Sequence, residues 1–210
     1  MFSFDGKFWR IMGFLGTMFL VNAMWLIGCL PVVTAGASTA AMLHTYLRIF
    51  DQRAEPLHRL FWKGFASNFK QATLVWIVYL ALFFDVGLVL WTGWQMDRLT
   101  SWRENRLFLG IMLVIGLLAL FTLQYIFGVI AYLDCSFQQC FTNALGLSFG
   151  HVGWTLLMLL LSALAAGIAY IAPFMTLLVF GAAGAADGRI LLNILRRQIG
   201  APEEEEKDAT

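Results

Sequence analysis

Residues 71–94 read QATLVWIVYLALFFDVGLVLWTGW and contain a single charged side chain, Asp85. A helix of this length rises ~36 Å, which exceeds the ~30 Å thickness of a bilayer's hydrocarbon core. The stretch therefore predicts a membrane-spanning helix. Similar apolar runs occur along the whole chain, and the predicted spans cover residues 11–33, 34–50, 71–94, 107–133, 152–172 and 174–195.

The composition of the chain agrees with this interpretation. Of its 210 residues, 60% are hydrophobic and 13% are charged, and the mean hydropathy is +0.75. A soluble domain is about 45–50% apolar and ~25% charged. The net charge of +1 also lacks the basic excess that nucleic-acid binding requires. We therefore expect an all-α, polytopic transmembrane bundle, a single integral membrane domain over residues 1–197, surrounded by lipid and without a nucleic-acid partner.

The number of crossings depends on residues 34–50, which are only weakly hydrophobic and rich in small side chains. Six crossings with both termini in the cytoplasm leave only Arg98, Arg103 and Arg106 outside, so 11 of the 14 Lys and Arg side chains are cytoplasmic. Five crossings give a weaker asymmetry. Cytoplasmic loops carry the excess of Lys and Arg in membrane proteins, so six crossings are favoured over five.

Two segments between the spans, residues 55–70 and 136–149, have apolar side chains at helical spacing with polar ones opposite. This pattern predicts amphipathic helices at the cytoplasmic interface. The first helix is basic, and we expect it either to lie on anionic lipid or to dock a partner. The candidate docking residues are Arg59, Phe61, Lys63, Phe65 and Lys70. The acidic tail, residues 198–210, is predicted to be disordered.

Polar side chains inside the predicted spans are the candidate functional residues, because a charge in lipid is costly. Helical rise places Gln124, Asp187 and Arg189 at a similar depth, so they form a candidate buried polar layer. Asn22 and Asp85 are further intramembrane polar residues. Two interpretations stay open: the three layer residues satisfy one another between helices, or they line a polar path or a substrate contact.

Small side chains recur at spacings of three and four in residues 181–188, GAAGAADG. This spacing predicts a close helix crossing, either within the bundle or with a partner. Motifs of soluble enzymes are absent from the sequence: it contains no G-x-x-x-x-G-K-[ST], H-E-x-x-H or G-x-S-x-G. We therefore expect no catalytic residues, no cofactor site and no metal site.

Several segments of the first half resemble the YesL-like family of bacterial integral membrane proteins. They are Asn22-x-x-Trp25, the run CLPVVT at 29–34, the run GASTAA at 36–41, and NFKQAT at 68–73. The similarity extends over residues 8–197. The resemblance implies a small helical protein of the bacterial cytoplasmic (inner) membrane, often encoded near sugar importers of the ABC class. It implies no catalytic residues, because the family has no characterised activity.

These observations together favour a non-enzymatic function. We expect an accessory or scaffold subunit of a membrane complex, such as a carbohydrate ABC importer whose membrane subunits the resemblance implies as partners. A second copy of the chain is left open as another partner. The alternative is a small secondary transporter or channel that acts on its own, which would need several polar groups converging near the bilayer midplane.

Overall fold

The structure is a computed structural model that describes residues 7–50, 55–96, 102–133, 136–172 and 176–199. Most of the predicted acidic tail, residues 200–210, lies outside the described residues. The described part of the chain is helical and contains no strand. Its elements are α1 (Lys7–Gly28), the short 3-10 helix η1 (Val32–Thr34), α2 (Ala35–Phe50), α3 (Leu57–Met96), α4 (Trp102–Tyr132), α5 (Phe137–Gly150), α6 (Val152–Ile171) and α7 (Thr176–Ile199).

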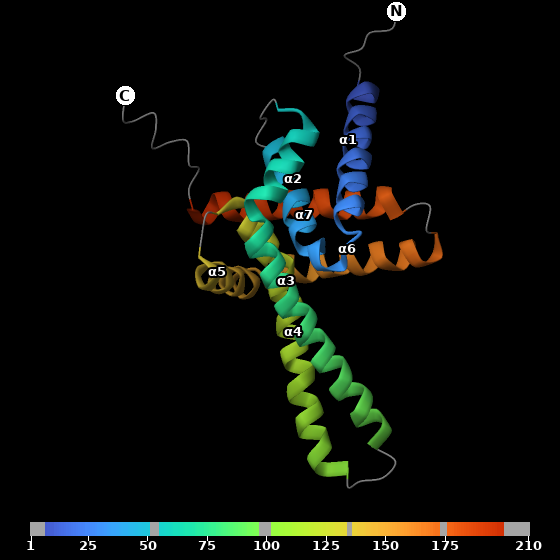
Figure 1. The fold of residues 1–210 in the computed structure, drawn as a ribbon, viewed down its shortest axis with the longest axis vertical. Helices are drawn as coiled ribbons and strands as arrows, with labels where there is room; N and C mark the ends of the chain where they lie inside the picture. The colour runs from blue at the N-terminus through green and yellow to red at the C-terminus, as the bar shows by residue number, and fades with distance from the viewer. Residues whose placement is uncertain (1–6, 51–54, 97–101, 134–135, 173–175, 200–210) are drawn as a thin grey trace, which may run out of the picture.

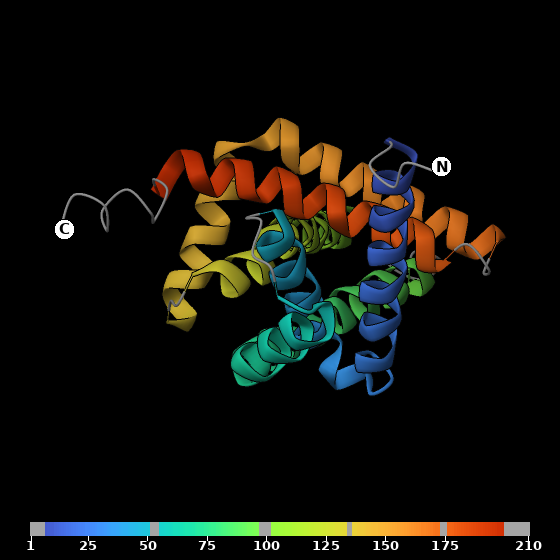
Figure 2. The same ribbon diagram turned by 90° about the horizontal axis from the view of Figure 1, so that it is seen from above.

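The helices are arranged around one long antiparallel hairpin (Figure 1). Helix α3 runs from one end of the molecule to the other, and α4 returns beside it. Helices α1 and α2 flank the upper half of α3. Helices α6 and α7 lie side by side and cross α1 steeply in both views (Figure 2), while α5 lies to one side. The six predicted spans therefore do not form a bundle with one common direction.

Helix α2 is the centre of the packing, although its sequence is the least apolar of the predicted spans. It contacts α1, α3, α4 and α7, and its side chains are buried over most of its length. Small residues explain this position, because Ala37, Ala40 and Ala41 are fully buried and let neighbouring helices approach closely. At Gly36 an added Cβ would lie 2.7 Å from the Ala72 carbonyl oxygen of α3.

The basic amphipathic segment is not a separate helix. The predicted interfacial helix 55–70 and the predicted span 71–94 form one continuous helix, α3. Pro56 precedes this helix, where its missing N–H does no harm, and no proline follows within it. Near the expected boundary the side chain of Asn68 donates a 3.0 Å hydrogen bond to the Gly64 carbonyl oxygen, and the helix continues through this point.

Helix α5, by contrast, is separate from α6. A capping box between Ser136 and Gln139 starts it, and the non-helical backbone of His151, with φ −132° and ψ 49°, ends it. Its predicted location at a membrane interface is a matter of orientation in the bilayer and stays a prediction.

Three described helices are long and apolar enough to cross a membrane. They are α3 over Leu57–Gly93, α4 over Leu107–Tyr132 and α6 over Val152–Ile171, and α1 contributes a shorter apolar stretch, Met12–Gly28. The all-α class is thus confirmed for the described residues, and the length and apolar character of these helices indicate a membrane protein.

Candidate functional site

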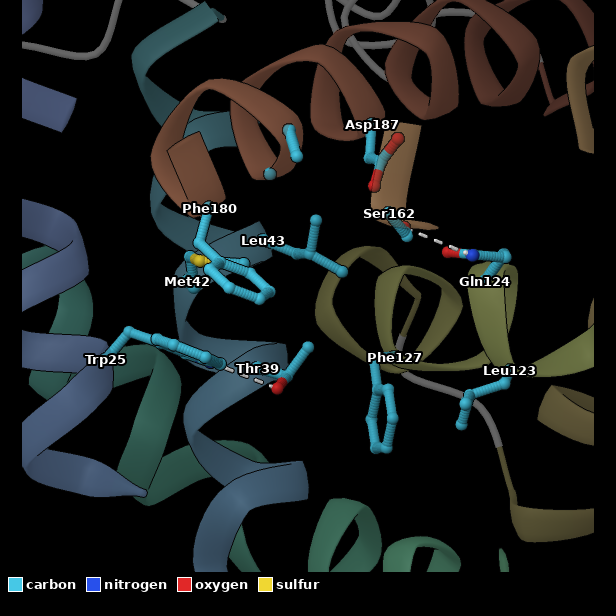
Figure 3. Close-up of a pocket in the computed structure, with 12 residues that line it drawn as sticks. Trp25, Thr39, Met42, Leu43, Leu123, Gln124, Phe127, Ser162, Phe180 and Asp187 are labelled. Atoms are coloured by element: carbon cyan, nitrogen blue, oxygen red, sulfur yellow. Dashed lines mark hydrogen bonds between the residues drawn. The ribbon is translucent and has the colours of Figure 1, made fainter. Parts of the chain in front are cut away.

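A cavity of about 190 Å³ lies where α1, α2, α4, α6 and α7 meet (Figure 3). Most of its wall is apolar. The polar side chains in the wall are Trp25, Thr39, Gln124, Ser162 and Asp187. Two of the three residues of the predicted polar layer, Gln124 and Asp187, therefore reach one cavity from different helices.

Glycines on α7 allow this helix to pack closely against α1 and α2, and this packing places Asp187 at the cavity. An added Cβ at Gly184 would lie 2.8 Å from Met42 Cε, and one at Gly188 would lie 3.2 Å from Tyr46 Cβ. At Gly181 it would collide with the amide of Asn22. The close crossing predicted for residues 181–188 is confirmed, and it lies within the chain, between α7 and the α1–α2 pair.

The carboxylate of Asp187 is the least satisfied polar group of the cavity. Its Oδ1 atom is buried and has no hydrogen-bond partner among the described residues. In Figure 3 the carboxylate points toward Ser162 and the end of Gln124. A buried polar atom without a partner costs about 1–3 kcal/mol, and more when it is charged. The cavity therefore contains an acceptor that a donor or a cation would stabilise.

The other polar groups of the wall are hydrogen-bonded to each other or to backbone. Gln124 Nε2 donates to Ser162 Oγ over 3.3 Å, which joins α4 to α6. Trp25 Nε1 donates to Thr39 Oγ1 over 3.2 Å, and the Thr39 hydroxyl donates to the Ala35 carbonyl oxygen over 2.8 Å. The indole of Trp25 also stacks on Phe180 with 5.7 Å between ring centroids. These contacts fix the positions of the walls.

Arg189, the third residue of the predicted layer, does not line the cavity. Its guanidinium lies 5.7 Å from the ring centroid of Phe50, and the side chain is exposed. Two helical positions correspond to a rotation of about 200°, so residues 187 and 189 face nearly opposite directions. Mutual pairing of Asp187 and Arg189 stays a prediction, and the structure gives Arg189 an aromatic contact instead.

The remaining predicted residues are dispersed. Asn22 is buried on α1, where its Nδ2 donates to the Met18 carbonyl oxygen over 3.0 Å. Asp85 is exposed on α3. Neither residue belongs to the cavity wall.

The candidate docking residues of α3 lie partly in the protein core and partly on its surface. Phe61 is fully buried in a cluster with residues of α1, α2 and α7, and Phe65 packs partly against it. Arg59, Lys63 and Lys70 are exposed. Phe61 therefore presents no surface to a partner, because its ring is covered by the protein's own helices.

Trp25, Thr39 and Ser162 are site residues that the sequence analysis did not identify. Each is a polar-tipped side chain within a predicted span, and this is the signal that identified Gln124. Among the described residues, no group of three or more His, Cys, Asp or Glu side chains lies close enough together to hold a metal ion.

Comparison with known families gives a match over the second half of α1, all of α2 and most of α3. Residues 18–88 match a family described as "Protein of unknown function, DUF624". The match covers about a third of the chain and contains the tightly packed contact between α2 and α3. No curated protein and no solved structure matches the chain. The matched family carries no activity that could be transferred, and the narrower likeness to YesL-like proteins stays a resemblance.

Proposed function

We propose that this chain is a non-enzymatic, multi-pass subunit of a membrane complex that binds its partner through the outer half of the α3–α4 hairpin. The observation that carries the proposal is the exposed carboxylate of Asp85 on the apolar surface of that hairpin. Membrane helices rarely present such a group to lipid.

The outer half of the hairpin is thinly packed. In residues 84–93 and 107–118, only Val86 and Gly116 are buried among the described residues, and they touch each other across the hairpin. Figure 1 shows this part extending beyond the other helices. Its exposed surface is apolar and consists of side chains such as Phe84, Leu88, Trp91, Leu107, Phe108, Ile111 and Val114.

Asp85 interrupts this apolar surface. Its neighbour Phe84 is among the most exposed apolar side chains of the hairpin, and no hydrogen bond or ion pair joins Asp85 to another described residue. An acidic side chain at the centre of a membrane helix costs about 2.5–3.5 kcal/mol on insertion scales. Such residues face a bundle interior and pair with another polar group. The partner that fits is a transmembrane helix with a Lys, Arg or hydrogen-bond donor at matching depth.

The proposal includes the finer points of topology that the charge distribution favours. These are six crossings and both termini in the cytoplasm. Residence in a bacterial cytoplasmic membrane is what the resemblance to the YesL-like family implies. The exposed Arg59, Lys63 and Lys70 would then face anionic lipid, where each basic side chain contributes about 1 kcal/mol. Membrane subunits of a carbohydrate ABC importer are the partner class that the resemblance to the YesL-like family supports.

The test is affinity purification of the tagged full-length chain from native membranes in mild detergent. The Asp85→Leu variant removes the carboxylate, and Thr92→Leu is the matched control. Thr92 is also exposed on the outer hairpin, and its hydroxyl already donates to the Leu88 carbonyl oxygen. We expect Asp85→Leu to lose the partner and Thr92→Leu to retain it, while both variants remain monodisperse.

Two outcomes would contradict the proposal. Equal recovery of the same partner with both variants would show that Asp85 is not at the interface. Purification of the wild-type chain alone, together with solute flux after reconstitution in liposomes, would favour an independent transporter. Recovery of only a second, differently tagged copy would identify the partner as the chain itself.

A further inference from the structure

We propose that the cavity between α1, α2, α4, α6 and α7 binds a small organic cation, a primary or quaternary ammonium group, with Asp187 as its counter-ion. This inference does not rest on the proposed docking function, because Asp85 and the outer hairpin do not line the cavity.

Asp187 contributes the carboxylate in the cavity wall, and its buried Oδ1 has no hydrogen-bond partner among the described residues. Arg189, the nearest cation in sequence on α7, contacts Phe50 instead. A cation in the cavity would therefore find an acceptor that no protein group occupies, and burial strengthens such an attraction because the local dielectric is low.

The walls indicate an organic cation. Trp25, Phe127 and Phe180 line the cavity together with Met42, and Figure 3 shows the rings of Trp25 and Phe180 on the side opposite Gln124. Aromatic faces attract ammonium groups by about 0.5–2 kcal/mol, most strongly when the pair is desolvated. A hard metal cation requires about six oxygen ligands, whereas most of this wall is carbon.

The polar wall of the cavity would fix the orientation of the bound cation. The Gln124 amide nitrogen donates to Ser162 Oγ, which leaves the amide oxygen Oε1 of Gln124 as an acceptor. An ammonium N–H has two types of acceptor available, the carboxylate of Asp187 and this amide. The methyl or methylene groups of the ligand would contact the apolar and aromatic wall.

The volume limits the size of the ligand. Pockets for drug-sized molecules measure ~300–1,000 Å³, whereas this cavity measures about 190 Å³. A single water occupies ~30 Å³ in the liquid, so the cavity accommodates a ligand of the size of a few waters. Tetramethylammonium and methylammonium are in this range and serve as probes.

The experiment uses the purified full-length chain in detergent. Thermal unfolding is followed by circular dichroism while tetramethylammonium chloride or methylammonium chloride is titrated. Sodium chloride controls for ionic strength, and tert-butanol is a neutral control of similar shape. We expect a saturable rise in Tm with an ammonium salt and none with either control. A ligand that binds only the folded state raises Tm in this way.

Variants assign the binding to the cavity. Asp187→Asn keeps the shape of the side chain and removes its charge, and we expect it to weaken ammonium binding by at least tenfold. Glu55→Gln removes the charge of an exposed carboxylate outside the cavity, so it is the matched control and should bind as the wild type does. Phe180→Leu removes one ring of the wall and should weaken binding about two- to fivefold.

The proposal is overturned if neither salt gives a saturable shift in the wild-type chain, if tert-butanol gives the same shift, or if Asp187→Asn binds as well as Glu55→Gln. Should Asp187→Asn fail to fold, the comparison of charged and neutral probes on the wild-type chain still decides whether a cation site exists.

Discussion

Replacing Phe61 by Ala tests whether the start of α3 belongs to the core or to a docking surface. Phe61 is 0% exposed and packs in a cluster with Met18, Val21, Met42 and Tyr46. Truncation of a buried Phe to Ala costs about 3–5 kcal/mol, since it loses apolar contact and leaves a cavity. We expect the free energy of unfolding to fall by this amount.

The matched control is Phe84→Ala, the same substitution on the same helix. Phe84 is 73% exposed, so only about a quarter of its surface is buried and the expected loss is about 1 kcal/mol. Unfolding is measured by circular dichroism in detergent micelles titrated with SDS. Small and equal losses for the two variants would refute the buried position of Phe61. If Phe61→Ala does not accumulate, Phe61→Leu should show a smaller loss that still exceeds that of Phe84→Leu.

Three further predictions concern helix packing and topology. Gly36→Ala should lower the free energy of unfolding by about 1–3 kcal/mol, because the new Cβ meets the backbone of α3; Gly167→Ala, which meets nothing within 4 Å, should be neutral or stabilising in the same SDS titration. A double-mutant cycle with Tyr79→Phe and Thr122→Val should show a coupling of about 1 kcal/mol for their buried 2.6 Å hydrogen bond between α3 and α4; additive losses would contradict that bond. Reporters that are active only in the cytoplasm should be active at both termini, and an inactive N-terminal fusion beside an active C-terminal one would indicate five crossings.

Much of the helix content follows from apolar runs, but the continuity of α3 does not. Residues 57–70 are amphipathic and residues 71–94 are apolar, so the change of pattern suggested a boundary at Gln71. The hydrophobic pattern of a helix reflects what surrounds each face and does not mark where the helix ends. Pro56 is the only proline near this segment that could interrupt a helix. The lack of any later Pro or turn signal before Met96 was the better indicator.

The cavity could be predicted only in part. Helical rise gives the depth of a residue, and it grouped Gln124 with Asp187, both of which line the cavity. Depth says nothing of the direction in which a side chain points, which is why Arg189 was grouped with Asp187 although the two face opposite sides of α7. The same limit applies to Phe61, because an apolar face does not reveal whether lipid, a partner or the chain's own α2 covers it.

The unbroken course of α3 makes it a lever. A helix of its length, Leu57 to Met96, extends ~60 Å, and α2 clamps it near one end through Gly36 and Gly64. Asp85 lies on the longer arm of the helix beyond this contact, and Phe61 on the shorter arm belongs to the same buried cluster as Met42. Met42 also lines the cavity beside Asp187. One continuous helix therefore connects the outer arm of the hairpin with the buried cluster that shares Met42 with the cavity wall.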